Sequence, residues 1–249
     1  MKTIEEFESH LKHIKGYAEK TIEVYLKYVK TLNENNNDYR KIMTLISGNS
    51  NNTKRVALSA IKSYYRYVGD LRVNEIELPK KNSNILPHVT YEEYCDILSN
   101  INKKPKKKFM KYIIVRLLFE TGVRASELLS IKKSDIIDNQ IVVNGKGSSQ
   151  RIINLSNNLI TELNKYLLNI TTDKIFNFGY KNLYKKIKNI ENNKKLTPHM
   201  FRRGYAKFCY SKGVSIYDIS LSMGHNDINT TAIYIKRKSE DVNITHIFS

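Results

Sequence analysis

Side chains that suit phosphate chemistry are scattered over the second half of the chain. Arginine stays charged at physiological pH, and its guanidinium can bind two phosphate oxygens at once. An imidazole or an ammonium can move a proton, and a phenol that loses its proton can act as a nucleophile. Together these groups supply what phosphoryl transfer needs without a metal ion. The residues are Arg124, Lys146, His199, Arg202, His225 and Tyr234.

Arg124 follows Gly122 at a point where one predicted helix should end and the next begin. A helix start presents free backbone N–H groups, and a forked cation beside them suits a phosphate. The alternative is that Arg124 pairs with Glu127, three residues on, and only caps the turn. Both interpretations stay open on this motif alone.

His199 and Arg202 are expected on the same face of one helix. Thr197 is a typical N-cap residue, and Pro198 fits the first helical position. A spacing of three residues then points the imidazole and the guanidinium the same way, near the positive end of the helix. Taken alone, the pattern is common, and a solvated basic turn is the simpler explanation.

Lys146, His225 and Tyr234 complete the set. Lys146 lies at the tip of a predicted glycine turn, 145–147, from which its ammonium could reach a groove, although most lysines at such tips are only solvated. His225 follows Gly224, a typical helix stop. Tyr234 falls on the next predicted helix, but one tyrosine among 17 would ordinarily be a core or surface residue.

Apolar residues at helical spacing predict a small helical unit in the first 70 residues. The following segment contains two prolines, Pro79 and Pro87, and little periodicity, which indicates an interdomain linker. We therefore predict a helical domain over 1–75, a linker over 76–89 and a second domain over 90–249.

The second domain is predicted to be mostly helical with one small β element. Residues over 136–143 and 151–155 are rich in β-branched side chains and flank the glycine turn, which indicates two antiparallel strands. Helical spacing dominates on both sides of this element. The predicted fold class is therefore mainly α, with a small antiparallel sheet in the second domain.

The set and its order resemble the tyrosine recombinase (phage integrase) family, especially its short Xer-like members. The motifs extend over about 90–240, and the helical N-terminal unit looks like the family's core-binding domain. Each motif alone is weak, but together, in this order and spacing, they are specific. The matching segments are Thr-Gly-Val-Arg-Ala-Ser-Glu-Leu at 121–128, Gly-Lys-Gly at 145–147, His-Met-Phe-Arg-Arg at 199–203, Met-Gly-His at 223–225 and Thr-Thr-Ala-Ile-Tyr at 230–234.

The resemblance implies a site-specific DNA recombinase and a role for each member of the set. Tyr234 would attack the scissile phosphate and form a 3′-phosphotyrosyl link, with His199 as general base and Lys146 as general acid for the departing 5′-oxygen. The two arginines would hold the non-bridging oxygens, and His225 would donate a further hydrogen bond. Strand exchange would follow without ATP, and no cofactor or metal ion is expected.

The match departs from the family pattern in three places. Met223 stands where Leu is frequent, and Lys236 stands where a His often follows the tyrosine. Residues 148–150 carry no positive charge, although a basic residue often follows the glycine turn. No departure removes a member of the catalytic set, but the contact of this loop with DNA is expected to differ.

The composition agrees with a polyanionic partner, because 42 Lys+Arg against 24 Asp+Glu leave a net charge of +18. The expected partner is double-stranded DNA with a specific recombination site, gripped by both domains. The resemblance implies a homo-tetramer on two such sites, from a free monomer or dimer, with the segment 239–249 docking on its own domain or a neighbour. The lysine-rich run 103–108 is as readily a solvated loop as a DNA contact. Candidate DNA contacts on the helix predicted over 53–68 are Lys54, Arg55, Lys62 and Arg66.

A cytoplasmic, nucleoid-associated protein is expected, with no membrane association. No segment approaches the ~18 apolar residues of a membrane span, and the N-terminus lacks a signal-peptide pattern. Two alternatives remain: relaxation of DNA in the manner of a type IB topoisomerase, and a non-catalytic DNA-binding protein. A metal-dependent nuclease would need a carboxylate cluster, and none stands out in the sequence.

Overall fold

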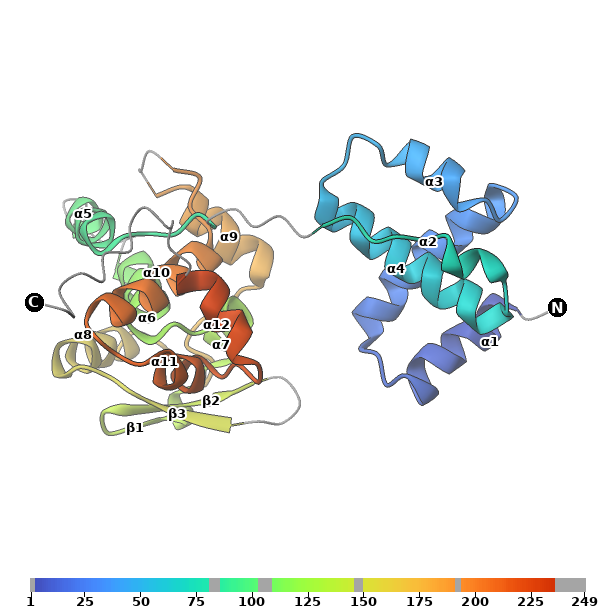
Figure 1. Cartoon of the computed structure of the whole chain (residues 1–249). Helices are drawn as coiled ribbons and strands as arrows, with labels where there is room; N and C mark the ends of the chain where they lie inside the picture. The colour runs from blue at the N-terminus through green and yellow to red at the C-terminus, as the bar shows by residue number, and fades with distance from the viewer. Residues whose placement is uncertain (1–2, 81–85, 103–108, 146–149, 191–193, 236–249) are drawn as a thin grey trace, which may run out of the picture. The chain divides into compact units, whose positions relative to one another are not determined.

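The computed structural model describes residues 3–80, 86–102, 109–145, 150–190 and 194–235. The chain forms two compact units, Met1–Asn84 and Ile85–Ser249 (Figure 1). The division falls inside the segment predicted as a linker. Lys146, Lys236, the lysine-rich run 103–108 and the C-terminal segment 239–249 lie outside the described residues.

The first unit is built from helices. Thr3 and Glu6 form a capping box at the start of α1, because each side chain accepts the other's backbone N–H. Two of the longest helices pack against each other, and Phe7, Val29 and Ile61 are fully buried in the core between the elements. The elements are α1 (Ile4–Ser9), the π-helical turn η1 (His10–Ile14), α2 (Glu19–Glu34), α3 (Tyr39–Leu45), α4 (Asn51–Val68) and the 3-10 turn η2 (Leu71–Asn74).

Two of the predicted DNA contacts are bonded to the described start of the linker segment. Lys62 donates from Nζ to the Ile76 carbonyl at 2.9 Å, and Arg55 donates to the carbonyl of Pro79. Both side chains come from α4, where Arg66 is exposed. Residues 76–80 therefore lie along the first unit as a bonded segment.

The second unit is organised around α6 (Phe109–Thr121), which is apolar on nearly every side and therefore buried. α5 (Tyr91–Asn102), α8 (Asn157–Leu167) and α10 (Pro198–Ser211) pack against it. The remaining elements are α7 (Ala125–Ser130), the 3-10 turn η3 (Lys133–Asp135), β1 (Ile136–Ile137), β2 (Gln140–Asn144), β3 (Gln150–Asn154), α9 (Tyr180–Lys188), α11 (Ile216–Met223) and α12 (Ile228–Ile235).

The sheet has three antiparallel strands in the order β1-β2-β3, with Ile141 paired to Ile153 and Val143 to Arg151. The expectation of one strand over 136–143 is wrong, because this segment is a tight hairpin. Asp138 adopts a positive φ of 50° and turns the chain back after β1. Asp is among the residues that tolerate this conformation, so the polar pair between two β-branched runs forms a turn.

The end of the predicted linker belongs to the core of the second unit. The Val89 N–H donates to the Met200 carbonyl at 3.1 Å, and Arg203 donates to the Pro87 carbonyl at 3.0 Å. Gly204 permits this approach of α10, because a Cβ there would collide with the carbonyl oxygen of Val89. Val89 is fully buried as a result.

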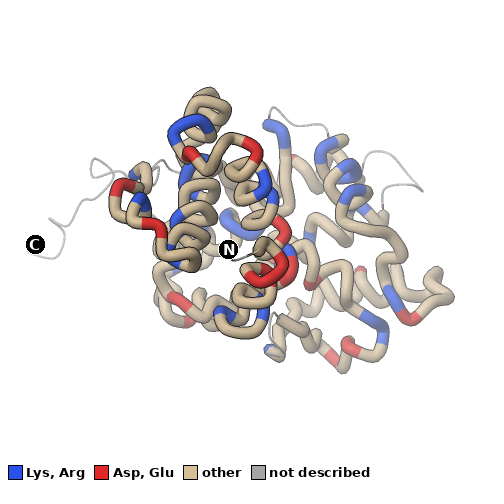
Figure 2. Tube along the Cα trace, turned by 90° about the vertical axis from the view of Figure 1, so that its right-hand side faces the viewer, with Lys and Arg blue, Asp and Glu red and all other residues tan. Residues whose placement is uncertain are grey.

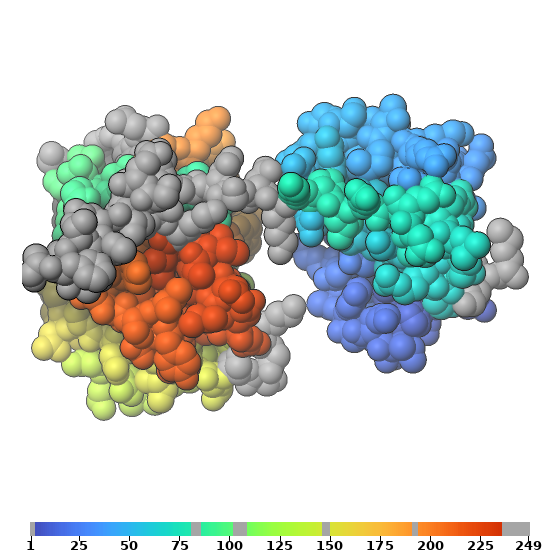
Figure 3. Space-filling view, viewed as in Figure 1, coloured from blue at the N-terminus to red at the C-terminus, as the bar shows by residue number. Residues whose placement is uncertain are grey.

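A small apolar cluster joins the last three helices, and they gather, in orange and red, on one face of the second unit (Figure 3). Ala206 of α10, Ile219 and Met223 of α11 and Ile235 of α12 form its buried part. Gly224 follows with a φ of 64°, a left-handed conformation that ends α11 and turns the chain toward α12. This cluster therefore positions the turn that carries His225.

Basic residues occur along both units, as the blue segments of the tube show, with acidic residues interspersed (Figure 2). Within the described ranges, no helix is both long enough and apolar enough to cross a bilayer. The same ranges hold no group of three or more His, Cys, Asp and Glu side chains placed to bind a metal ion.

Candidate active site

Arg124 is the N-cap residue of α7, and its predicted pairing with Glu127 is present. Its backbone N–H donates to Glu127 Oε2 at 2.7 Å, and its Nη1 donates to Glu127 Oε1 at 2.7 Å. Its Nη2 donates to the carbonyl of Gly224 at 2.9 Å. One third of the side chain is exposed, so the guanidinium is anchored and still open to a ligand.

Glu127 is buried, with an exposed fraction of 3%, and it binds a second arginine. Arg151 of β3 donates to both of its oxygens, at 3.1 and 2.8 Å. Burial alone would raise the pKa of Glu127, but the hydrogen bonds from Arg151 and Arg124 lower it to about 2. Sequence reasoning did not assign Arg151 to the site, because its only signal was a basic residue shortly after the glycine turn.

Arg202 is 1% exposed and uses its donors inside the fold. It donates to the carbonyl of Gly122, and its Nη2 donates to the Met223 carbonyl at 2.8 Å and lies 2.7 Å from His225 Nε2. Burial, followed by the charge of Arg124, lowers its pKa to about 10. In the described part of the chain no carboxylate forms an ion pair with Arg202.

The arginines converge on the end of α11. Arg151 Nε, Arg202 Nη2 and Arg124 Nη2 donate to three consecutive carbonyls at 2.9, 2.8 and 2.9 Å. Carbonyls at a helix C-terminus have no partner within the helix and carry partial negative charge. This helix end therefore holds three guanidinium groups from three different elements together. The three carbonyls belong to Ser222, Met223 and Gly224.

The two histidines have different surroundings. His225 is half-buried, and burial together with Arg202 and Arg124 lowers its pKa to about 4. His199 has an exposed outer edge, yet partial desolvation and then the nearby arginines, Arg203 foremost, also lower its pKa. Both imidazoles are therefore neutral at pH 7 and can accept a proton.

Tyr234 of α12 lies beside this group in the same chain. Its ring centroid is 5.6 Å from that of His225, with the rings edge to face. Arg203 Cζ lies 5.8 Å from the Tyr234 centroid. The phenol is thus near the arginine and histidine cluster without a second copy of the chain.

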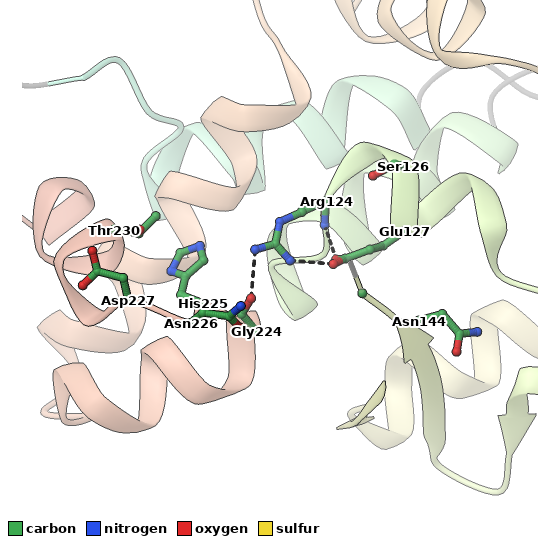
Figure 4. Close-up of a pocket in the computed structure, with 10 residues that line it drawn as sticks. Arg124, Ser126, Glu127, Asn144, Gly224, His225, Asn226, Asp227 and Thr230 are labelled. Atoms are coloured by element: carbon green, nitrogen blue, oxygen red, sulfur yellow. Dashed lines mark hydrogen bonds and ion pairs between the residues drawn. The ribbon is translucent and has the colours of Figure 1, made fainter. Parts of the chain in front are cut away.

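A cavity of about 610 Å³ opens between α7, the end of β2 and the turn before α12. In Figure 4 the Arg124 guanidinium lies between Glu127 on one side and Gly224 and His225 on the other. Gly145 also lines the cavity, and Lys146 is the next residue along the chain, outside the described residues. The lining residues are Arg124, Ser126, Glu127, Asn144, Gly145, Gly224, His225, Asn226, Asp227 and Thr230.

The cavity holds the Arg124 guanidinium and the neutral imidazole of His225, with the Tyr234 phenol beside that imidazole, a combination that suits a phosphodiester. The model of the phage integrase family matches residues 87–241. The chain belongs to the phage integrase family. This recombinase is 29% identical over 257 aligned residues to tyrosine recombinase XerA of Thermococcus onnurineus (strain NA1), which covers 94% of this chain and 90% of that protein. It is 35% identical over 151 residues to tyrosine recombinase XerA of Saccharolobus solfataricus, covering 57% of this chain and 50% of that protein.

Solved structures share the fold of the recombinase. A crystal structure of XerA recombinase has a TM-score of 0.56 at 22% identity, covering 96% of this chain and 95% of that one. A lambda integrase dimer bound to a COC′ core site has a TM-score of 0.74 at 15% identity, covering 97% and 79%. The predictions of a tyrosine recombinase and of a mainly α fold with a small antiparallel sheet are confirmed.

Proposed function

We propose that this recombinase cuts and rejoins DNA at a specific site, with Tyr234 as nucleophile and Arg124, Arg202, His199, His225 and Lys146 as its catalytic partners. One observation supports this assignment above the others. In a single chain, the His225 imidazole lines the cavity together with Arg124 and contacts both the Tyr234 ring and Arg202, which has no carboxylate partner among the described residues.

In the cleavage step Tyr234 Oη forms a bond to phosphorus, and the bond from phosphorus to the 5′-oxygen breaks. The phenol must lose its proton to act as a nucleophile, and His199 is the base that accepts it. Lys146 returns a proton to the departing 5′-oxygen. The phosphotyrosyl ester keeps the bond energy, so a 5′-hydroxyl can reverse the step without ATP.

The charges of the cluster suit the transition state. Glu127 neutralises one arginine, and Arg124, Arg151 and Arg202 together leave an excess of positive charge. A phosphodiester gains negative charge on its non-bridging oxygens as the nucleophile adds, and fixed donors stabilise that charge most in a desolvated site. In this proposal Arg124 and Arg202 supply those donors, Arg202 by giving up its present acceptors, whereas Arg151 stays with Glu127.

Strand exchange needs a 5′-hydroxyl from a second duplex, so we infer that the recombinase acts as a homo-tetramer on two double-stranded DNA sites. A lambda integrase tetramer bound to a Holliday junction has the same fold, with a TM-score of 0.72 at 16% identity. The segment 239–249 is the proposed docking element, on its own domain or on a neighbour. Mass photometry of the protein on the selected duplex would count the subunits.

The activity is tested by covalent capture from a library of nicked duplexes with randomised cores, in buffer with a chelator. We expect an adduct that survives denaturation, is enriched for one core sequence and is lost in Tyr234→Phe. A chelator-sensitive product, or an adduct that persists in Tyr234→Phe, contradicts the mechanism. A plasmid with two selected cores then separates recombinant products from relaxation alone, the outcome expected of a topoisomerase.

The role of Lys146 has its own test. In a duplex with sulfur in place of the bridging 5′-oxygen, the leaving thiolate needs no proton because its pKa is low. We expect Lys146→Met to cleave the normal duplex at least about 100-fold more slowly, as general acid catalysis contributes ~10²–10⁴-fold. The sulfur duplex should restore its rate, and a defect that persists there would exclude Lys146 as the acid.

A further inference from the structure

The imidazole of His225 lies between Arg202, which has a role in the proposed cleavage, and Thr231, which has none so far. Its Nε2 lies 2.7 Å from Arg202 Nη2, and its Nδ1 lies 2.7 Å from the hydroxyl oxygen of Thr231. Thr231 belongs to α12, the helix of Tyr234, and is fully buried. Both nitrogens of the imidazole therefore have defined partners.

The chemistry of these partners determines where the imidazole carries its hydrogen. A guanidinium has only donors, so Arg202 must donate and Nε2 must accept with its lone pair. A neutral imidazole with a lone pair on Nε2 carries its hydrogen on Nδ1. That hydrogen is donated to Thr231, whose hydroxyl oxygen can accept it.

We propose that Thr231 is a positioning residue: its hydroxyl oxygen accepts the Nδ1 hydrogen and so stabilises the Nδ1–H tautomer of His225, which presents the Nε2 lone pair to Arg202. The groups that face His225 agree with a neutral ring. Arg202, Arg124 and Arg151 oppose a second proton, while Glu127 favours one. Tyr234 contacts the ring edge to face.

The guanidinium of Arg202 is oriented by three hydrogen-bond acceptors. The carbonyls of Gly122 and Met223 and the Nε2 atom of His225 accept its hydrogens. Because a fully buried arginine without these acceptors would be left with unsatisfied donors, their geometry determines how its fork is presented. Thr231 acts on this geometry through one intervening ring.

The same tautomer changes the role of His225 in cleavage, an inference that rests on the proposed function. In this form His225 offers the phosphate no hydrogen from Nε2. It supports Arg202 instead, and it can donate from Nε2 to a phosphate oxygen only after Arg202 turns away and Nε2 gains a hydrogen, by a second protonation or by a shift to the other tautomer. The two roles of His225 therefore differ by the hydrogen on Nε2 and by the direction of one hydrogen bond.

The tautomer is read directly by two-bond ¹H–¹⁵N NMR of histidine-labelled protein without DNA, with the His225 signals assigned by their loss in His225→Gln. We expect Nδ1 to resonate as a protonated nitrogen and Nε2 as an unprotonated one at pH 7. The opposite pattern, or rapid exchange between the two, overturns the proposal. This result stands whether or not the protein cleaves DNA, so it fails separately from the proposed function.

Two variants link the tautomer to the reaction. Thr231→Val keeps the shape and removes the acceptor, whereas Thr231→Ser keeps the hydroxyl. We expect Thr231→Val to show a mixed tautomer and to form the covalent adduct about 10-fold more slowly, as the loss of one orienting hydrogen bond implies, with Thr231→Ser close to the parent. Thr161→Val, at an exposed position of α8 where the hydroxyl donates to the Asn157 carbonyl, controls for the substitution type.

A solely structural role for Thr231 predicts a different result. Thr231→Val would then lower the midpoint of thermal unfolding while the tautomer of His225 and the pH dependence of cleavage stayed as in the parent, which would overturn the proposal. If Thr231→Val does not fold, the comparison passes to Thr231→Ser and Thr231→Ala. A parent-like tautomer in Thr231→Ala would then overturn it, and a mixed one would support it.

Discussion

The carboxylate of Glu127 and the guanidinium of Arg151 face each other with two hydrogen bonds, from Nη1 to Oε1 at 3.1 Å and from Nη2 to Oε2 at 2.8 Å. Arg151 is 13% exposed and lies on the sheet, whereas Glu127 lies in the first turn of α7. The same carboxylate binds Arg124. A buried pair therefore links the sheet to an arginine proposed to hold the phosphate.

Glu127→Gln removes the charge of that carboxylate and leaves Arg151 without an ionic partner. Breaking one side of a buried ion pair typically costs about 3–5 kcal/mol, and we expect a loss in the free energy of unfolding near the lower end of that range. We also expect adduct formation to slow about 10-fold, because Arg124 loses its anchor. Urea unfolding and a covalent-capture time course measure the two effects.

The double variant Glu127→Gln/Arg151→Met should be less destabilised than the sum of the single variants, because the two residues interact directly. Additive effects would show that the pair contributes nothing beyond its separate contacts. Glu162→Gln is the matched control, since Glu162 pairs with Lys165 on an exposed helix surface, where an ion pair contributes ~0–1 kcal/mol.

Acid should destabilise the protein in two successive windows. The folded-state pKa of His225 is about 4, below its usual 6.5. Between these pH values the unfolded chain binds a proton at this histidine and the folded chain does not, so the free energy of unfolding decreases as the pH falls. The pKa of Glu127 is about 2, below its usual 4.5, so a second loss follows between pH 4.5 and 2. From His225 alone we expect a loss on the order of 2 kcal/mol between pH 7 and pH 4.

Chemical unfolding at intervals of half a pH unit would resolve the two windows. His225→Gln should reduce the loss of stability in the upper window, to which His199 also contributes, and leave the lower window in place. A slope between pH 6.5 and 4 that is the same in the parent and in His225→Gln would contradict the lowered pKa of this histidine.

Gly204→Ala should be strongly destabilising, because the new Cβ would meet the backbone oxygen of Val89, which cannot move aside as a flexible side chain would. We expect a loss of about 2 kcal/mol or more, in the range of overpacked core sites. Gly179→Ala is the control, since nothing lies within 4 Å of its added Cβ. A Gly204→Ala protein as stable as the control would mean that α10 and the Val89 segment separate easily.

The salt dependence of duplex binding should respond differently to substitution of two basic residues of α4, because one is exposed and the other is hydrogen-bonded within the first unit. Arg66 is exposed, so Arg66→Gln should reduce the slope of log affinity against log salt by about one phosphate contact. Lys62→Gln should change that slope less, because Lys62 Nζ donates to the Ile76 carbonyl. Fluorescence anisotropy between 50 and 300 mM salt, about the range where such slopes are measured, provides the comparison. Equal changes in slope would show that Lys62 leaves its carbonyl when DNA binds.

Much of the site followed from local patterns. Thr197 and Pro198 start α10 and put His199 and Arg202 on one turn, and Gly224 ends α11 with a left-handed residue, as their types predict. The meeting of these segments was predicted by motif order and resemblance, since periodicity alone says nothing of which helices touch.

Contacts between elements far apart in the sequence were harder to predict. The pairing of Arg151 with Glu127 depends on how the sheet packs against α7, and no local pattern specifies it. The hairpin at Asp138 was missed because short apolar runs on both sides read as one continuous strand. The tautomer of His225 depends on partners from two helices, and only their three-dimensional arrangement reveals it.

Three successive carbonyls at the end of α11 receive hydrogens from three arginines of separate elements. In the absence of DNA, these carbonyl oxygens accept the hydrogen bonds that a phosphate would accept, and they hold together three guanidinium groups that would otherwise repel one another. A scissile phosphate competes with these carbonyls for the same donors. Binding of the phosphate therefore removes hydrogen bonds from the end of α11, and the peptide that leads into α12, the helix of Tyr234, becomes less tightly held.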